Sequence, residues 1–282
     1  MKLCRYGKPG YERPGMIDTD GRLRDLSKIV ENIGPRELSP RGLKMLSRVK
    51  PESLPPVNGN PRFGVPYVGI GKFVAIGLNY SDHAKEAGLP IPSEPIVFLK
   101  ATTCISGPHD DVVQPRGSTK LDWEVELGVV IGTQAKYVDE ASALGHVAGY
   151  CIVNDVSERA FQMATTQWDK GKGFDTAGPI GPWLATSDDV RDPQALDMWL
   201  DVNGKRMQSG NTRTMVFDVA KIISHVSHYM TLLPGDIIAT GTPPGVGLGI
   251  KPDPVFLRPG DLMTLGITGL GEQRQKVVAY AA

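Results

Sequence analysis

Short apolar runs recur from Val68 onward, and glycine and proline separate them from one another. Runs of that length between such breakers are typical of β-strands, whereas apolar positions three and four apart are typical of helices. The pattern predicts strands at 72–78, 124–131, 148–153, 198–202, 237–240, 262–267 and 275–278. It predicts helices at 39–48, 81–87, 157–164 and 216–230. Because strands outnumber helices and do not alternate with them, we expect an α+β fold rather than a repeated βαβ array.

The first part of the chain has a pattern of its own. Residues 1–65 contain a basic first strand and a hairpin that turns at Asp20-Gly21, a favoured two-residue turn. The Pro-rich stretch 51–66 then has the composition of a linker. We therefore expect a small β-rich N-terminal domain at 1–65 and a larger domain at 66–282. Since no candidate site residue falls in the first, it should lie outside the site.

Composition argues against several classes of partner. Over 282 residues, Lys plus Arg is 31 and Asp plus Glu is 31, so the formal net charge is zero and no basic stripe favours nucleic acid. No apolar run reaches the length that spans a bilayer, and the start has no apolar signal core. Three cysteines stand far apart, which argues against a disulfide framework. We expect a reduced, cytoplasmic protein that binds neither nucleic acid nor membrane.

The segment from Asp122 to Gly132 carries the strongest chemical signal. Side chains on a strand alternate between faces, so Asp122, Glu124 and Glu126 share one face. Carboxylates that close together repel unless a cation lies between them, and carboxylate oxygens suit Mg²⁺, Mn²⁺ or Ca²⁺. Asp155 stands where another apolar strand ends and is a third candidate ligand. The alternative is a solvated strand face and a simple turn, and the pattern alone leaves the two readings even.

Two pairs of polar residues lie at helical spacing. His83 and Glu86 are three residues apart, so they share a helical face, where a carboxylate would orient the imidazole as a general base. Arg159 and Gln162 share a face just after Asp155, and they could hold a substrate carboxylate. For each pair the alternative is the exposed side of a surface helix.

Two glycine-rich segments are candidates for mobile or anion-binding loops. The segment 168–175 contains Lys172 between glycines, and such a loop could close over a site; the alternative is a solvated loop. The segment 240–249 follows a strand, as a phosphate-binding loop does, but prolines stand where the required helix should begin. We therefore reject a nucleotide site there, and a backbone nest for a carboxylate stays open.

Taken together, these segments resemble the fumarylacetoacetate hydrolase family over almost the whole chain. The matching motifs occur in the family's order, and five in that order are specific where any one would be weak. They are Gly77-Leu78-Asn79-Tyr80 with His83 and Glu86, then Phe98-Leu99-Lys100 with Gly107-Pro108, Asp122 to Gly132, Asn154 to Arg159, and Gly241-Thr242-Pro243 to Gly247.

The resemblance implies a mixed β-roll catalytic domain, usually in homodimers, and a role for each candidate residue. It implies Mg²⁺ or Mn²⁺ on Glu124, Glu126 and Asp155. It implies that His83 and Glu86 activate water from a mobile lid, and that the lid's Lys172 supports the reacting carbonyl. The remaining matches are substrate contacts at Arg159, Gln162 and Thr242, and a basic residue beside the metal at Lys100. The lid between Gln162 and Lys172 is short, which weakens the case for substrate contacts carried on it.

The implied activity is hydrolysis of a C–C bond in a 2,4-dioxo acid, with release of pyruvate or a related 2-oxo acid. Within the family the chain looks most like bacterial members that act on 2,4-diketo-3-deoxy sugar acids. The nearest alternative is ureidoglycolate lyase, since relatives of this type often carry that label. Decarboxylation, isomerisation or hydration could use the same metal site, because a fold and a metal do not choose the reaction. A non-catalytic carboxylate-binding protein is the least favoured alternative.

Overall fold

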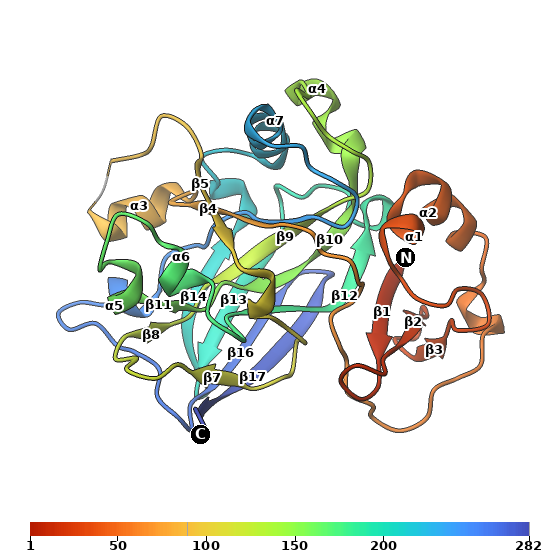
Figure 1. Cartoon of the computed structure of the whole chain (residues 1–282), viewed down its shortest axis with the longest axis horizontal. Helices are drawn as coiled ribbons and strands as arrows, with labels where there is room; N and C mark the ends of the chain where they lie inside the picture. Colours follow the sequence, from red (N-terminus) through yellow and green to blue (C-terminus); the bar gives the residue numbers. More distant parts are fainter. Residues whose placement is uncertain (89, 282) are drawn as a thin grey trace.

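The computed structural model describes residues 1–88 and 90–281, apart from the side chains at positions 83, 84 and 87. Within these residues, ten strands form one mixed sheet in the order β3-β2-β1-β12-β10-β9-β15-β4-β5, with β6 beside β12 (Figure 1). Their bounds are β1 Lys2–Tyr6, β2 Arg13–Ile17, β3 Leu23–Asp25, β4 Phe73–Gly77, β5 Ile96–Lys100, β6 Ile105–Ser106, β9 Val125–Ile131, β10 Val147–Asn154, β12 Gly178–Thr186 and β15 Ile237–Ala239.

A second sheet of five strands follows the order β14-β13-β16-β17-β7 in the described part of the chain. Its strands are β7 Val112–Gln114, β13 Asp197–Val202, β14 Lys205–Asn211, β16 Leu262–Ile267 and β17 Gly271–Ala279, and a separate pair joins β8 Leu121–Asp122 to β11 Ser157–Glu158. The α-helices are α1 Pro35–Leu38, α2 Pro40–Leu46, α3 Ser81–Ala87, α4 Glu140–Ala143, α5 Arg159–Gln162, α6 Asp169–Lys172 and α7 Val219–Tyr229. The expected α+β class is confirmed. None of these helices combines the length and the apolar composition that a membrane-spanning helix needs.

The core forms where the two sheets pack together, and β9 and β10 of the large sheet contact strands β13, β16 and β17 of the second. Helices α4 and α7 lie at the top of the view in Figure 1. Every residue of β9 and of β10 is buried. A strand covered on both faces reads as a continuous apolar run rather than an alternating one, which is why Val125 to Ile131 is almost wholly apolar. Glu126 is the exception within β9, and a buried carboxylate in such a strand needs a partner.

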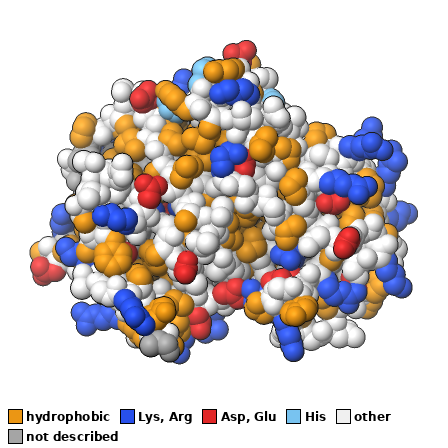
Figure 2. Space-filling view, in the orientation of Figure 1, with side chains coloured by type: hydrophobic (Ala, Val, Ile, Leu, Met, Phe, Trp, Pro, Cys, Tyr) orange, Lys and Arg blue, Asp and Glu red, His pale blue; other side chains and the backbone are white. Residues whose placement is uncertain are grey.

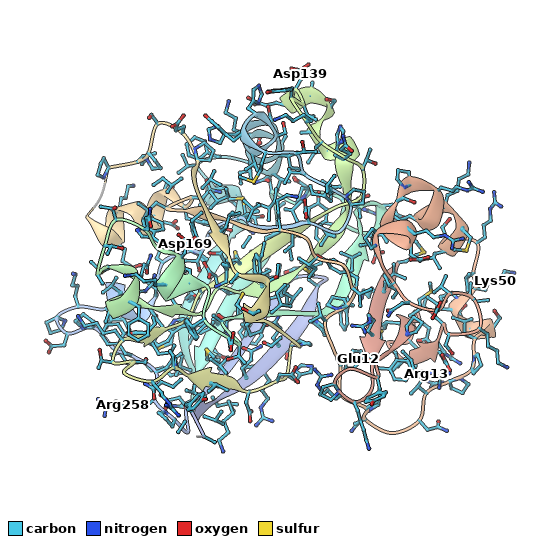
Figure 3. All side chains as sticks on the ribbon, viewed as in Figure 1. Glu12, Arg13, Lys50, Asp139, Asp169 and Arg258 are labelled. Carbon is cyan, nitrogen blue, oxygen red and sulfur yellow. The ribbon has the colours of Figure 1, made fainter. Side chains whose placement is uncertain are left out.

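The N-terminal segment continues the large sheet, since β1 pairs with β12 as well as with β2. The guanidinium of Arg62 donates to both carboxylate oxygens of Asp110, at 2.5 and 2.6 Å, and to Glu12 at 2.9 Å. Glu12 is labelled in Figure 3 near the larger body of the molecule. The division into two domains at residue 65 stays a prediction. The pairing of β1 with β12 and the ion pair of Arg62 with Asp110 join the two parts.

The surface carries both signs of charge. On the face shown in Figure 2, acidic and basic side chains are interspersed over the larger body, and Lys and Arg gather over the N-terminal helices.

One local expectation is wrong. The pattern predicts a helix over 157–164, but Ser157 and Glu158 pair with β8 as strand β11, and α5 begins only at Arg159. The Glu158 side chain caps this helix by accepting from the amide of Ala160. Pairing with β8 satisfies the backbone of Ser157 and Glu158 in the strand, so the helix starts later.

Candidate metal centre

The pairing of β9 with β10 brings the three candidate metal ligands together. Asn154, the last residue of β10, lies opposite Val125, the first residue of β9. Asp155 therefore follows β10 directly beside Glu124, and its amide donates to the Glu124 carbonyl at 2.9 Å. One carboxylate oxygen from each of Glu124, Glu126 and Asp155 lies within 4.8 Å of the other two. The pairing of β9 with β10 thus brings Glu126 together with Glu124 and Asp155, which flank the two strands, as a compact set of oxygen ligands.

All three carboxylates are buried, with exposed fractions of 5% for Glu124, 2% for Glu126 and 1% for Asp155. Burial raises the pKa of Glu126 well above its ordinary value, and the nearby charges of Asp155 and Glu124 raise it further. A group whose charged form is disfavoured by two like charges is stabilised by a cation placed between them. The solvated-face alternative for this strand is therefore excluded.

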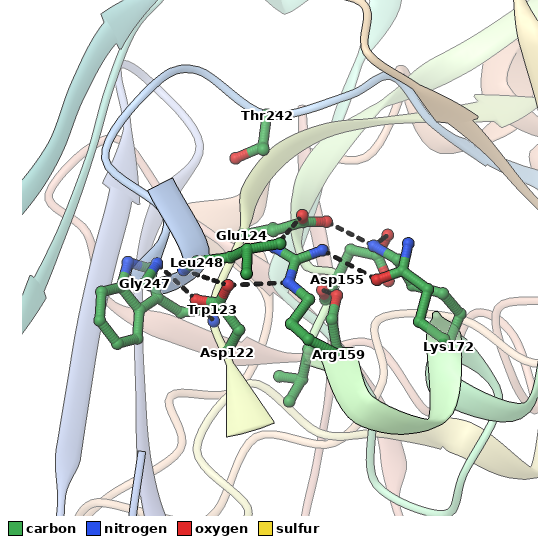
Figure 4. A network of polar contacts seen from close by, with 12 residues as sticks. Asp122, Trp123, Glu124, Asp155, Arg159, Lys172, Thr242, Gly247 and Leu248 are labelled. Atoms are coloured by element: carbon green, nitrogen blue, oxygen red, sulfur yellow. Dashed lines mark hydrogen bonds and ion pairs between the residues drawn. The ribbon is translucent and has the colours of Figure 1, made fainter. Parts of the chain in front are cut away.

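Two lysines contact this triad. The ammonium of Lys172 donates to Glu124 at 2.5 Å and to Asp155 at 2.7 Å (Figure 4). Lys100 donates to the other oxygen of Asp155. Burial alone would lower the pKa of Lys172, but Asp155 and Glu124 outweigh burial and raise it, so this lysine is held in its charged form.

Arg159 bridges the triad to a fourth carboxylate. Its guanidinium donates to Glu124 at 2.6 Å and to Asp122 at 2.8 Å, as Figure 4 shows, and to the side-chain oxygen of Gln162 at 3.1 Å. The predicted pairing of Arg159 with Gln162 on one helical face is confirmed, but both side chains are buried and not on a solvated surface. Asp122 was expected on one strand face with Glu124, but Asp122 ends β8 and Glu124 precedes β9, so the two do not share a strand. Their carboxylates meet at Arg159, which Asp122 holds.

The charge balance tests whether a divalent ion fits. The charged side chains described at this centre are the carboxylates of Asp122, Glu124, Glu126 and Asp155 and the cations of Lys100, Arg159 and Lys172. This set has a formal excess of one negative charge, in a region where an uncompensated charge is costly. A divalent ion on the triad would reverse the excess to one positive charge, which a substrate carboxylate would neutralise. The all-oxygen ligand set suits Mg²⁺ or Mn²⁺. The residues therefore fit such an ion.

The segment expected to be a glycine-spaced loop, 168–175, contains a short helix instead. Asp169, labelled in Figure 3, begins α6, and Lys172 ends it. A Cβ at Gly171 would stand 2.4 Å from the amide nitrogen of Gln162, so only glycine lets α6 pack this closely on α5. That contact fixes the helix and aims Lys172 at the triad.

The glycine-rich segment 240–249 does bind carboxylates through its backbone, but they are the protein's own. The amide of Gly241 donates to Glu126 at 2.8 Å, and that of Gly247 donates to Asp122 at 2.6 Å. The amide of Gly245 donates to Glu86, at 3.0 and 3.2 Å from its two oxygens. This segment therefore holds the carboxylates of β8, β9 and α3 in place through its own amides. Those amides are thus occupied by carboxylates of the protein.

Gln208 is a residue of this centre that sequence reasoning missed. It is fully buried on β14, and its side-chain oxygen accepts from the amide of Val125, between two of the candidate metal ligands. Its side-chain nitrogen donates to the Thr242 hydroxyl and to the Pro243 carbonyl, both at 2.8 Å. The Thr242 hydroxyl in turn donates to the Val125 carbonyl at 2.9 Å. Gln208 thus connects β9 to the glycine-rich segment 240–249. The hydroxyl proton of Thr242 is donated to Val125 and is therefore not available to a ligand.

The predicted dyad is described only in part. His83 belongs to helix α3, but its side chain lies outside the described residues, so its expected place beside Glu86 is not tested. Glu86 is held at Gly245 and is not among the described residues that line the cavity at the triad.

That cavity has a volume of about 70 Å³ and two unlike sides. One side is polar, and the other is formed by β4, β5 and the residue before α6. The polar residues are Glu124, Glu126, Asp155, Arg159, Gln162, Lys172 and Thr242, and the others are Ile76, Gly77, Leu78, Phe98 and Trp168. The structure therefore brings the predicted metal ligands, Arg159, Gln162, Lys172 and Thr242 to one space.

A buried carboxylate triad beside a cavity that also presents Arg159 and Lys172 can hold a divalent ion next to an anionic small molecule. The model of the family described as fumarylacetoacetate (FAA) hydrolase C-terminal matches residues 72–278. The chain belongs to the fumarylacetoacetate hydrolase family, whose members include hydrolases.

Individual relatives agree with this assignment. A protein of Burkholderia multivorans, named only as a putative hydrolase, is 61% identical over 276 residues, which cover 98% of each chain. The fumarylacetoacetate hydrolase of the psychrophilic Exiguobacterium antarcticum has a TM-score of 0.89 and 36% identity, covering 99% of this chain and 100% of that one. The maleylpyruvate hydrolase of Sphingobium sp. SYK-6, solved in complex with manganese(II) and pyruvate, has a TM-score of 0.83 and 31% identity and covers 100% of both chains.

Proposed function

We propose that the chain hydrolyses a C–C bond in a 2,4-dioxo acid and releases pyruvate or a related 2-oxo acid, with Mg²⁺ or Mn²⁺ on Glu124, Glu126 and Asp155. The observation that carries this proposal is the buried carboxylate triad, which opens onto a cavity that also presents Arg159 and Lys172. A similar protein that hydrolyses maleylpyruvate and was solved with manganese(II) and pyruvate supports both the substrate class and the metal.

The residues of the cavity divide the work of such a reaction. A bound divalent ion would supply Lewis-acid stabilisation of negative charge on the oxygens of the dioxo acid. Arg159 and Gln162 line the cavity together, and we assign them to the substrate carboxylate. Lys172 is held charged and would stabilise the oxyanion that forms at the 4-carbonyl.

Water activation falls to helix α3 in this proposal. His83 takes a proton from water, and Glu86 orients the imidazole. The oxygen of that water adds to the 4-carbonyl carbon, and the bond between carbons 3 and 4 then breaks. The electron pair stays on the pyruvate fragment, which takes up a proton, and the acyl fragment leaves as a carboxylic acid.

The test is pyruvate release from a panel of acylpyruvates, followed with coupled lactate dehydrogenase. We expect activity that disappears after exhaustive chelation and returns when Mg²⁺ or Mn²⁺ is added to the same sample. The panel should include diketo-deoxy sugar acids, and ureidoglycolate should be tested separately for release of glyoxylate and urea, since it has no pyruvate unit. Full turnover after chelation would contradict the metal, and absence of pyruvate from every dioxo acid would contradict the reaction.

A substitution remote from α3 can test the positioning of Glu86. A Cβ at Gly249 would stand 2.6 Å from Cδ and 2.8 Å from Oε2 of Glu86, so Gly249→Ala should push the carboxylate from its place at Gly245. We expect kcat to fall by about tenfold or more, since a ~1 Å misplacement near the chemistry can cost ~10²-fold. The matched control is Gly145→Ala, where an added methyl meets no atom within 4 Å. Equal kcat in the two variants would show that the position of Glu86 is irrelevant to turnover.

A further inference from the structure

Two glutamines occupy inward positions of strand β17, where an apolar side chain would be expected. The side chains of β17 alternate between exposed and buried, as they do on a strand with one covered face, and Gln273, Gln275 and Val277 are the buried ones. Both glutamines are fully buried. Burying an amide group is costly unless its hydrogen bonds are made. Each glutamine therefore needs partners inside the protein.

The side chains of Gln273, Gln275 and Asn154 form a run of hydrogen bonds, here called the amide network, that ends at the carboxylate triad. Gln275 donates to the side-chain oxygen of Gln273 at 2.8 Å and accepts from the side-chain nitrogen of Asn154 at 3.1 Å. The side-chain oxygen of Asn154 accepts from the backbone amide of Glu124 at 3.2 Å. Asn154 also immediately precedes Asp155, so the network meets the backbone of two candidate metal ligands.

The far end of the amide network fixes its direction. The side-chain nitrogen of Gln273 donates to the carbonyls of Ile152 and Gly181, at 2.9 and 3.0 Å. A carbonyl can only accept, so Gln273 must turn its nitrogen to these two groups and its oxygen to Gln275. The side-chain nitrogen of Gln275 also donates to the carbonyl of Pro108 at 2.6 Å. The oxygen of Gln275 is therefore left for the asparagine, and Pro108, from one of the motifs noted in the sequence, takes part in the network.

The near end requires the same direction. A backbone amide can only donate, so Asn154 must present its oxygen to Glu124 and its nitrogen to Gln275. Reversing any one of the three side-chain amides would set two donors or two acceptors face to face. A buried polar network that is satisfied in a single arrangement fixes the backbone segments that it joins.

We propose that Gln273 and Gln275 are positioning residues that act through Asn154 and hold the candidate metal ligands at the spacing that a divalent ion needs. This inference rests on the metal binding that is part of the proposed function. The like charges of the triad favour a wider spacing, and a network with one arrangement opposes that spread. Residues that orient metal ligands from behind typically contribute about 10- to 100-fold to metal affinity.

The first experiment measures the Mn²⁺ affinity of the full chain by calorimetric titration, well below the melting temperature of each variant. Gln275→Met keeps the length of the side chain but removes its hydrogen bonds, and we expect the dissociation constant of Mn²⁺ to rise by about tenfold or more. The matched control is Gln194→Met. Gln194 donates to the carbonyl of Thr212 and accepts from the amide of Val219, neither of which is among the described residues that line the cavity.

The control should lower the melting temperature and leave Mn²⁺ affinity unchanged. An unchanged dissociation constant in Gln275→Met would overturn the inference, because the network would then contribute to stability alone, while the proposed function would stand. If the wild-type protein itself bound no Mn²⁺, the proposed metal centre and this inference would fail together.

The second experiment tests whether Gln275 acts through Asn154. Asn154→Ala cuts the network beside the triad and should raise the dissociation constant of Mn²⁺ at least as much as Gln275→Met does. The double variant Asn154→Ala/Gln275→Met should bind Mn²⁺ no more weakly than Asn154→Ala, because its second change removes a group that is already disconnected.

A second cycle leaves Asn154 in place, in case Asn154→Ala does not fold. Gln273→Met removes the outermost hydrogen bonds and should weaken Mn²⁺ binding less than Gln275→Met does. The double variant Gln273→Met/Gln275→Met should then match Gln275→Met in Mn²⁺ affinity. Losses of affinity that add in either cycle would overturn the inference, since the glutamines would then affect the triad by separate routes.

Discussion

Glu124→Gln is expected to remove metal binding and to lower kcat by about 10²-fold or more, while the protein stays folded. The amide keeps the shape of the side chain but gives up the negative charge that a divalent ion needs. Lewis-acid stabilisation contributes several kcal/mol to a transition state, and each ~1.4 kcal/mol is tenfold in rate. The fold should persist because Arg159 keeps Asp122 and Lys172 keeps Asp155 as partners.

The measurements are Mn²⁺ affinity by calorimetric titration, kcat by pyruvate release, and the melting temperature. A matched control is Glu140→Gln, which alters an exposed carboxylate paired with Lys221 on the surface. The control should leave Mn²⁺ affinity and kcat unchanged. Unchanged Mn²⁺ affinity in Glu124→Gln would mean that the triad is a cluster of structural ion pairs and not a metal centre.

The carboxylate triad was predictable from the sequence because its signal is local. Glu124 immediately precedes β9, Glu126 is the second residue of that strand, and Asp155 follows β10, its neighbour in the sheet. Alternation on a strand and the position of strand ends are properties of a short window. The pattern alone fitted a solvated strand face equally well. The structure excludes that alternative because β9 is buried. This burial depends on packing against the second sheet, which a short stretch of sequence does not reveal.

Gln208 shows the opposite case. It stands on β14 among Lys205, Arg206 and Ser209, a stretch that reads as a polar edge strand. Its role comes from hydrogen bonds with Val125 and Thr242, which are 83 and 34 positions away in the sequence. A buried glutamine that joins two distant segments has no periodic signature, so only the tertiary arrangement identifies it.

Strand β12 was missed for a different physical reason. Pro179 and Pro182 interrupt its sequence, and proline in a central strand normally removes a ladder hydrogen bond. The structure accommodates Pro182 in an irregular register between β10 and β12, where Tyr150 lies opposite Ala185 and Ile152 lies opposite Gly181. A bulge of this kind lets a strand deviate locally while the sheet continues. Sequence rules for strand breakers therefore fail where the strand itself bulges at the proline.

Substitutions in the predicted dyad of His83 and Glu86 should lower the rate of catalysis without weakening ligand binding. His83→Ala is expected to lower kcat by about 10²-fold or more, the scale for loss of a general base. The dissociation constant of oxalate, a mimic of the carboxylate and 2-oxo end of the substrate, should change little, because oxalate needs the metal and its neighbours rather than a base. Glu86→Ala should give a smaller loss of the same kind, since the role proposed for Glu86 is to orient the imidazole and not to contact water. Its carboxylate also accepts from the amide of Gly245.

The pH–rate profile gives this prediction a second readout. A protonated imidazole cannot accept a proton from water, so the wild-type rate should fall as the pH decreases, and His83→Ala should lose that acidic limb. His146→Ala, which changes a histidine bonded to the Thr133 carbonyl, is the matched control and should keep the profile. If His83→Ala weakened oxalate binding as strongly as it lowered kcat, the imidazole would be a binding group and not the base. Chemistry without water activation, such as decarboxylation or lyase cleavage at the same carboxylate centre, would then become the better account of the site.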